Sequence, residues 1–403
     1  MKFLRRISNR QLLAVGSAVV ALAAGTTALA MATNGSGPKP NPKPLPVAVH
    51  DALTAPSVSG VSARIKFTNH LVDSSSIQAG SDPIISGATG RLWASADGML
   101  RLELQASSDG GGGGDSQVLV DHNHFWIYES GANTVYQGTI PGQGEGSSAS
   151  QRESGKAAEQ PLSLDQIKRD IARLEQHATL SGATPSDVAG RPTYTVRIAP
   201  KNDGGLLGGA ELAWDSARGV PLRAAVYASG DSSPVLQLEA TDVSFGSVPS
   251  SVFAVSPPPG AKVVDLSPPG QKPANKHDVA PVTGLSAVQK QIDFRLVAPD
   301  SLAGLPRGEV RGITVGKHAA ALVTYGKGLG GVAVIESGSE PGTSTAPAAN
   351  GEASLPKVSI NGTQGEELDT ALGTLLRFSR GGVDYTVVGS VPAAAAEAAA
   401  RGL

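Results

Sequence analysis

The chain of 403 residues contains no cysteine. This absence excludes disulfide bonds, thiolate metal sites, cysteine nucleophiles and a lipid-modified amino-terminal cysteine. Aromatic residues make up only 4% of the chain, so each cluster of them is informative. Neither sign of charge is in excess, because 33 Lys and Arg residues stand against 35 Asp and Glu residues. The net charge of -2 supplies no basic surface, and we predict no nucleic-acid partner.

Glycine and proline, by contrast, are plentiful, with 50 and 28 residues. Together they make up about a fifth of the chain, against a usual share of roughly 12%. This composition favours turns and loops over long helices. The length is sufficient for two or three domains, each with its own core.

The first 33 residues have the pattern of an export segment. The first ten residues include four basic residues and no acid, and no charge follows from Leu12 to Ala32. This uncharged run is longer than the roughly 7–15 residues of a signal-peptide core and close to the ~20 needed to span a bilayer. The small residues of "ALAMA" would also suit a signal peptidase. Residues 1–33 are therefore either a transmembrane anchor in the cytoplasmic membrane or a cleaved signal peptide, and both place the remaining chain outside the cytoplasm.

Changes in composition divide the rest of the chain into four parts. Residues 34–46 alternate prolines with polar residues, which is typical of an extended linker. Residues 47–265 form a first domain, and the proline-rich residues 266–284 form a second linker. Residues 285–403 predict a smaller α+β domain, with a hairpin near its middle and a helix in "AAAAEAAARGL".

The first domain has the period-two pattern of antiparallel strands. In "MLRLELQ" the residues Leu100, Leu102 and Leu104 share one face, and "YTVRIAP" alternates in the same way. One strongly amphipathic helix is predicted from Leu164 to Ala178, with a capping box that starts at Ser163. Weaker helical cover is expected over residues 47–53. These patterns predict a sheet with one buried face and little helical cover.

The segment "DHNH", Asp121–His124, could be a metal site or a turn. On a strand, His122 and His124 would point the same way, as paired metal ligands do. No third ligand lies nearby, however, and Asp and Asn favour turns through their own side-chain hydrogen bonds. We therefore predict the tight turn of a β-hairpin and no bound metal.

Motifs for catalysis or cofactor binding are weak. "GKGLGG", Gly326–Gly331, matches a dinucleotide-binding pattern, but a strand follows it where that pattern needs a helix. The sequence has no G-x-S-x-G and no Walker A motif. A Ser/His/Asp site built from distant residues stays open. We predict a protein that is not an enzyme and has no cofactor.

The alternating strands could build an apolar cleft for a ligand or an ordinary sheet core. Composition does not separate these alternatives. The residues predicted to line a cleft share an apolar character and a place in an alternating strand, and they are Leu102, Trp126, Tyr128, Tyr194, Trp214, Leu222 and Leu238.

Three segments, in order, carry a resemblance to a known family. They are "GRLWASADGMLRLEL", "VLVDHNHFWIYESGANTVYQG" and "DVAGRPTYTVRIAPKNDGGLLGGAELAWDSARGVPLRAAVY". Their order resembles that of the LolA-like superfamily, which includes lipoprotein carriers and the regulator RseB, also called MucB. The match covers about residues 47–265. The matching residues are Trp126, Tyr128, Asn133, Val135, Tyr136, Gly190, Arg191, Tyr194, Pro200, Trp214, Asp215, Gly219, Pro221 and Leu222.

The resemblance implies a fold and two functions. The implied fold is α+β, an open, half-closed antiparallel β-barrel with covering helices and an apolar concave face. Carriers of the superfamily hold lipid or lipoprotein acyl chains there, and the RseB-like branch contacts a membrane anti-sigma factor. The superfamily supplies no catalytic residues. The sequence therefore predicts a membrane-anchored, extracytoplasmic protein that binds lipid or acylated lipoprotein, or alternatively an RseB-like envelope-stress regulator.

Overall fold

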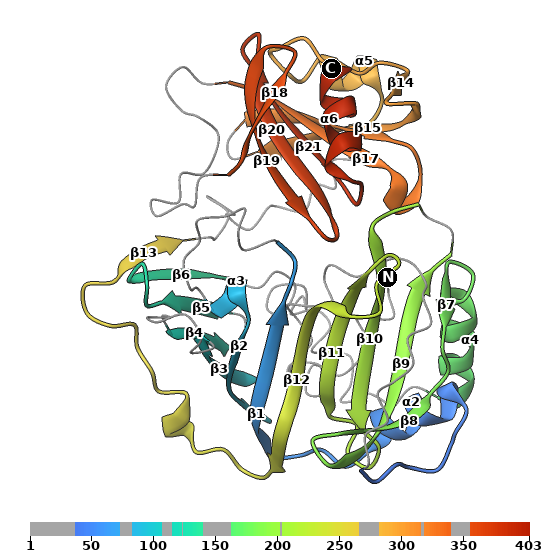
Figure 1. Cartoon of the computed structure of the whole chain (residues 1–403), viewed down its shortest axis with the longest axis vertical. Helices are drawn as coiled ribbons and strands as arrows, with labels where there is room; N and C mark the ends of the chain where they lie inside the picture. Colours follow the sequence, from blue (N-terminus) through green and yellow to red (C-terminus); the bar gives the residue numbers. More distant parts are fainter. Residues whose placement is uncertain are drawn as a thin grey trace, which may run out of the picture. The chain divides into compact units, whose positions relative to one another are not determined.

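The structure is a computed structural model, and it describes residues 37–72, 83–106, 115–122, 124–139, 163–201, 204–265, 282–315, 318–339 and 355–403. The chain packs as two compact units (Figure 1). Among the described residues, the first unit spans 37–70, 83–201 and 208–265, and the second spans 71–72, 204–207 and 282–403, with the gaps given above. Both units are built mainly from β-strands.

The first unit contains a 13-stranded sheet. Its strands run in the order β13-β6-β5-β4-β3-β2-β1-β12-β11-β10-β9-β7, and β8 pairs with β9 beside this path. The pairings from β6 through β1 to β12, of β11 with β12, and of β9 with β7, β8 and β10 are antiparallel, whereas β13 pairs with β6 in parallel. The strand bounds are β1 Gly60–Asn69, β2 Ala88–Ser95, β3 Met99–Ala106, β4 Asp115–Asp121, β5 His124–Glu129, β6 Thr134–Thr139, β7 Ala178–Leu180, β8 Thr184–Val188, β9 Arg191–Pro200, β10 Leu207–Asp215, β11 Pro221–Ala228, β12 Pro234–Phe245 and β13 Lys262–Asp265.

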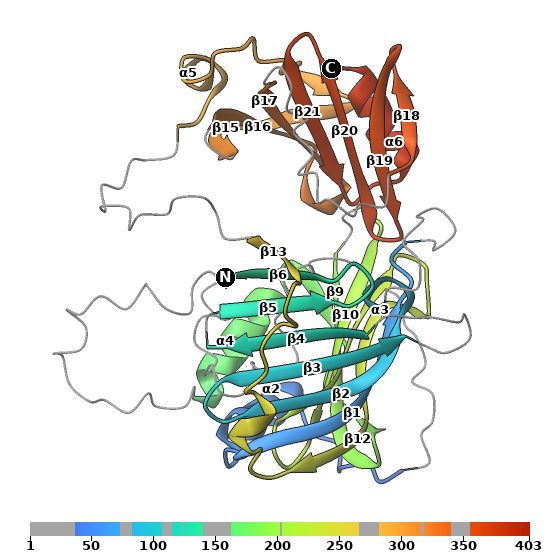
Figure 2. The same ribbon diagram turned by 90° about the vertical axis from the view of Figure 1, so that its left-hand side faces the viewer.

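The sheet bends strongly near β1 and β12, so that β2 to β6 lie at a steep angle to β9 to β12 (Figures 1 and 2). Helices α2 (Leu45–Thr54), α3 (Pro83–Ser86) and α4 (Leu164–Leu174) accompany it. In Figure 2, α2 and α4 lie behind strands β2 to β5. This unit is thus a large mixed sheet with few helices, which confirms only the β part of the expected architecture.

Helix α4 begins where the sequence predicts and ends earlier. The Ser163 hydroxyl accepts a hydrogen bond from the Gln166 N–H, which confirms Ser163 as the amino-terminal cap. The helix ends at Leu174, whereas the pattern predicted helix as far as Ala178. Ala178 instead opens β7 and pairs with Pro200 of β9. Pairing with the edge of the sheet therefore takes this last turn out of the helix.

Two apolar clusters form the core of the first unit. The larger cluster joins strands from both arms of the bend, with Leu92 and Leu104 from one arm and Leu222 and Leu238 from the other. The smaller cluster lies beneath α2. Its buried members are Leu45, Ala48, Tyr194, Val196 and Trp214.

A strap, residues 246–261, crosses strands β1 to β6 on the face that Figure 2 turns toward the viewer. It contains the short helix η4 (Ser250–Val252) and leads into β13. The guanidinium of Arg101 on β3 donates to the Val252 carbonyl oxygen at 2.7 Å. The Asn133 amide donates to the Gly260 carbonyl oxygen at 3.3 Å, directly before β13 joins the sheet. The strap therefore covers one face of these strands, called the outer face from here on.

The second unit contains an eight-stranded antiparallel half-barrel, in the order β14-β15-β16-β17-β21-β20-β19-β18. Its elements are η5 Gly328–Gly330, α5 Leu285–Gln289, α6 Ala393–Arg401, and the strands β14 Ser301–Leu302, β15 Leu305–Val315, β16 His318–Tyr325, β17 Val332–Gly338, β18 Lys357–Ile360, β19 Thr363–Thr370, β20 Gly373–Arg380 and β21 Val383–Gly389.

The predicted α+β class is correct only in part, for the first unit as for this one, because both are mostly β with few helices. The terminal helix is confirmed as α6, and "GKGLGG" is confirmed as a loop between two strands, β16 and β17. The remaining helical structure is limited to short turns, because glycine-rich turns connect strand directly to strand. The unit is therefore mostly β with one packed helix.

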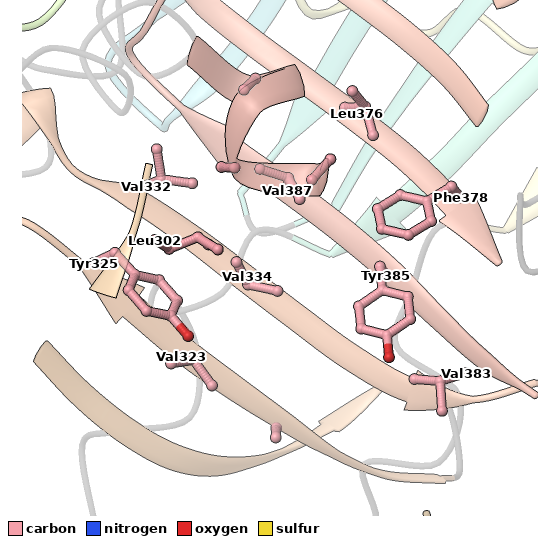
Figure 3. Packing of buried hydrophobic residues seen from close by; sticks show 14 of the residues in the cluster. Leu302, Val323, Tyr325, Val332, Val334, Leu376, Phe378, Val383, Tyr385 and Val387 are labelled. Atoms are coloured by element: carbon pink, nitrogen blue, oxygen red, sulfur yellow. The ribbon is translucent and has the colours of Figure 1, made fainter. Parts of the chain in front are cut away.

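Alternate residues of its strands form one continuous core (Figure 3). Phe378 and Tyr385 stack with ring centroids 4.9 Å apart. Three alanines of α6 are fully buried against the sheet, namely Ala396, Ala399 and Ala400. The second unit thus has a core of its own.

Among the described residues, no helix is long and apolar enough to cross a membrane. The predicted anchor or signal, residues 1–33, lies outside those residues, as does most of the predicted linker 266–284.

Candidate functional site: the inner face of strands β3 to β5

Strands β3, β4 and β5 carry a continuous apolar surface on the face opposite the strap. Leu100, Val120 and Phe125 are cross-strand partners in one row. The next row on this face contains Leu102, Val118 and Ile127. All six side chains are half-buried. We call this set the inner patch: Leu100, Leu102, Val118, Val120, Phe125 and Ile127.

The inner patch continues the core face of the first unit. Leu100 and Leu102 pack against the larger core cluster, opposite Ala94 and Leu92 of β2. The other four residues belong to none of the apolar clusters found among the described residues. Apolar surface of this kind gains about 25 cal/mol for each Å² removed from water. The patch is therefore a physically plausible place for an apolar ligand.

The outer face of the same strands has a different chemistry. Arg101 lies over the Trp93 ring at 5.6 Å and is held by the strap. Trp126 on β5 lies in the same cross-strand row as Arg101 on β3, and therefore on the same face. Tyr128 lies on this face too, and its hydroxyl donates to the Asn133 side chain at 3.1 Å. The aromatic residues of the outer face thus lie among charged and amide groups.

The seven residues predicted to line a cleft do not lie on one surface. Leu102 belongs to the inner patch, whereas Trp126 and Tyr128 lie on the opposite face. Tyr194 and Trp214 are buried together beneath α2, with ring centroids 6.2 Å apart. Leu222 and Leu238 are buried in the larger core cluster.

Five residues of the inner patch were missed from the sequence. In "VLVDHNHFWIY" both faces are apolar, so alternation alone does not say which face continues the core. Phe125 and Ile127 belong to the inner face because they stand in the same cross-strand rows as Leu100 and Leu102. These rows are set by the turn at residues 121–124. The residues of the turn can be recognised in the sequence, but the register that they set with β3 cannot.

The residues that carry the family resemblance mainly hold turns. Asp215 is buried, its carboxylate pairs with the Arg191 guanidinium at 2.8 Å, and it accepts the N–H of Arg218 at 2.8 Å. Gly219 has a φ of +67°, and a Cβ there would lie 2.3 Å from the Ala52 carbonyl oxygen of α2. Glycine is therefore required where the β10–β11 turn meets the helix.

No family model matches the chain, and the curated proteins contain no match. Solved structures do match. A complex of MucA and MucB from Pseudomonas aeruginosa is 18% identical, covers 88% of this chain and 94% of its own, and has a TM-score of 0.38. A crystal structure of MucB is 16% identical, with 88% and 96% covered and a TM-score of 0.37. A LolA-superfamily protein from Nitrosomonas europaea is 12% identical, with 53% and 99% covered and a TM-score of 0.19.

The chain resembles MucB and LolA-superfamily proteins. The resemblance inferred from the three sequence segments is thus confirmed as a structural similarity at low sequence identity. At these identities the similarity concerns the fold.

The described residues contain no group of three or more His, Asp or Glu side chains able to hold a metal ion. His122 has a φ of +55° in the tight turn between β4 and β5, which confirms the predicted hairpin. Its side chain is 67% exposed and its Nδ1 lies 2.5 Å from the Asp121 carboxylate.

Replacing both His122 and His124 with alanine is expected to change the free energy of unfolding by no more than about 1 kcal/mol, because both are exposed. Chemical denaturation of the purified chain measures this change, and elemental analysis of both proteins is the companion measurement. Stoichiometric zinc that is present in the parent and lost in the double variant would contradict the turn interpretation.

Proposed function

We propose that the chain is a non-enzymatic, extracytoplasmic regulator of the RseB type that binds an anti-sigma factor at the cytoplasmic membrane. The observation that carries the proposal is the second unit. It is a complete half-barrel with its own core, so it supplies a binding module that a carrier of one acyl chain does not need. The resemblance to the RseB-like branch, whose members also append a second domain, implies a two-domain layout of this kind.

The proposed partner is the extracytoplasmic segment of a membrane anti-sigma factor. Two of the similar MucB structures contain MucA, and a partner of that kind fits this proposal. The uncharged residues 12–32 and the basic residues before them favour a location at the outer side of the cytoplasmic membrane, as an anchored or exported protein.

A second candidate function, binding of lipid or lipoprotein acyl chains, is favoured by the inner patch. Six apolar side chains are half-buried on one face, and four of them, Val118, Val120, Phe125 and Ile127, lie beyond the core clusters of the described residues. Each methylene group that leaves water contributes about 0.8 kcal/mol, so a long acyl chain needs no charged contact to bind there.

The two functions are separated by testing both ligands on the exported part of the chain. Peptides that cover the extracytoplasmic segments of the organism's membrane anti-sigma factors are titrated by calorimetry, and a fluorescent fatty-acyl probe is titrated by anisotropy. We expect at least one peptide to bind with micromolar or tighter affinity. A folded protein that binds the acyl probe and none of the peptides would contradict the regulator proposal and leave the carrier function.

A pair of variants on β5 tests the inner patch. We expect Phe125→Asp to weaken acyl-probe binding at least tenfold, equivalent to about 1.4 kcal/mol, because a carboxylate on the apolar face must be desolvated. His124→Asp is the matched control, since it places the same charge one residue away on an exposed position. Equal binding by both variants would show that the inner patch does not hold the acyl chain.

A further inference from the structure

The side chain of Arg197 on β9 is buried without hydrogen-bond partners. The residue is only 9% exposed, and its Nε, Nη1 and Nη2 atoms are all buried and unpaired. A guanidinium carries five N–H donors and stays charged at every physiological pH. Buried groups of this kind normally have acceptors, so three unpaired nitrogens point to an absent acceptor.

Arg197 differs in this respect from other arginines of the same sheet. The Nε atoms of Arg101 and Arg223 are also buried and unpaired, but each of these residues uses terminal nitrogens in hydrogen bonds. Arg101 bonds to the strap, and Arg223 donates to the Glu211 carboxylate at 2.7 Å. In the part of the chain that the structure describes, Arg197 alone has all three guanidinium nitrogens buried and unpaired.

The Tyr227 ring on β11 holds the guanidinium by its flat face. The Arg197 Cζ lies 4.0 Å from the ring centroid, which is close stacking. An aromatic ring attracts the charge but accepts none of the N–H groups that lie in the guanidinium plane. The buried, unpaired nitrogens on the edge of this plane carry parallel N–H donors, the geometry that binds both oxygens of a carboxylate or phosphate.

The surrounding charges disfavour an anion that carries more than one negative charge. Glu211 is the cross-strand partner of Arg197, yet its carboxylate pairs with Arg223. Glu239 stands opposite Arg223 on β12 and accepts a hydrogen bond from Gln237 at 2.6 Å. Burial, and then the charge of Glu211, raise the pKa of Tyr227. The two arginines and the two acids of this cluster sum to no net charge, so a singly charged carboxylate adds less repulsion here than a phosphate, which carries about -1.5 to -2 as a monoester.

We propose that Arg197, stacked on Tyr227, is the anchor of a carboxylate-binding site in the first unit. The carboxylate takes the free edge of the guanidinium as a bidentate partner, and the Arg223–Glu211 pair borders it. This site is separate from the inner patch and does not depend on the proposed anti-sigma partner. The same chemistry is present in a small free carboxylate and in the head group of a fatty acid.

The test follows the Nε–H resonance of Arg197 in the exported part of the chain, assigned by its loss in Arg197→Lys. Acetate, decanoate and inorganic phosphate are titrated at constant ionic strength set with sodium chloride. We expect a saturable shift with acetate or decanoate and a higher melting temperature with the same ligand. Equal affinities would identify a site for small carboxylates, and a decanoate affinity at least tenfold higher would identify a site for fatty acids.

Two variants and a control complete the experiment. Arg197→Met removes the charge and is expected to abolish the ligand-dependent rise in melting temperature. Arg197→Lys keeps the positive charge but lacks the planar pair of N–H donors, so it is expected to weaken binding at least tenfold. This second variant keeps the test valid if Arg197→Met does not fold. Arg91→Met, at an exposed arginine of β2, should bind like the parent chain. The absence of any saturable shift, or a shift with phosphate alone, would overturn the proposal.

Discussion

Replacing Glu336 with glutamine is expected to stabilise the second unit by about 3 kcal/mol at pH 8 and to remove most of its pH dependence between pH 4.5 and 7. Glu336 lies on β17 and is 0% exposed. Burial raises the pKa of its carboxyl from 4.5 to about 7, against the opposing effect of one hydrogen bond from the Val297 N–H. Glutamine keeps an oxygen for that N–H at 2.9 Å and carries no charge.

The direction of the effect follows from the proton that the folded state retains. Between pH 4.5 and 7 the folded unit binds more protons at Glu336 than the unfolded chain does, so stability falls as the pH rises through this window. Below pH 4.5 both states are protonated and the penalty is absent. Above pH 7 a buried carboxylate remains whose Oε1 has no hydrogen-bond partner. One unit of pKa corresponds to 1.36 kcal/mol, which gives the expected size.

The measurement must report on the second unit alone. All three tryptophans, Trp93, Trp126 and Trp214, lie in the first unit, so their fluorescence follows that unit only. Hydrogen exchange at core amides such as Val334, at pH 5, 6 and 8, reports on the second unit. Glu309→Gln, at an exposed position of β15, serves as the control. A wild-type stability that is equal at pH 5 and pH 8 would contradict the buried, proton-binding state of Glu336.

Trp214→Ala is expected to lower the free energy of unfolding of the first unit by about 3–5 kcal/mol. Trp214 is 5% exposed and packs with Tyr194 beneath α2. The Tyr194 hydroxyl in turn donates to the Asn41 carbonyl oxygen at 2.5 Å, just before the helix begins. Removing the indole therefore leaves a cavity and loosens the attachment of α2 to the sheet.

Trp126→Ala is the control variant for the stability that Trp214→Ala is expected to lose. Trp126 has the same side chain but is half-buried on the outer face, so its removal should cost clearly less than that of Trp214. Guanidinium denaturation followed by the fluorescence of the remaining tryptophans measures both variants. Equal losses would show that Trp214 does not act as the support of α2.

The sequence indicated the strands, the β4–β5 turn and the cap of α4 because these depend on local rules. The turn needs Asp121 and its neighbours, and the cap needs Ser163 alone. The two faces of β5 could not be assigned, since Phe125 and Trp126 are both apolar. Only the register that runs from β5 through β4 to β3, more than twenty residues earlier in the chain, identifies Phe125 as the continuation of the core.

Arg197 and Glu336 show a second limit of pattern analysis. In "YTVRIAP" alternation assigns Arg197 to the solvent side, and the structure buries it against Tyr227 of a strand that is not its neighbour. Glu336 shares its face with Val332 and Val334, so period two would place it inside, contrary to its charge. Both positions depend on contacts across a sheet, which composition and local spacing do not contain.

Strand β13 comes last in the sequence of the first unit and pairs in parallel with β6. This pairing is where the unit should break first when it is pulled. β13 pairs with β6 through only four residue positions, and the chain continues from Asp265 toward the second unit. Each such hydrogen bond contributes only about 1 kcal/mol. Tension applied to the chain at Asp265 would therefore peel β13 away first and then lift the strap, before it loaded the long pairing of β1 with β12. Pulling would uncover Trp93 and Arg101 while the rest of the sheet stayed intact.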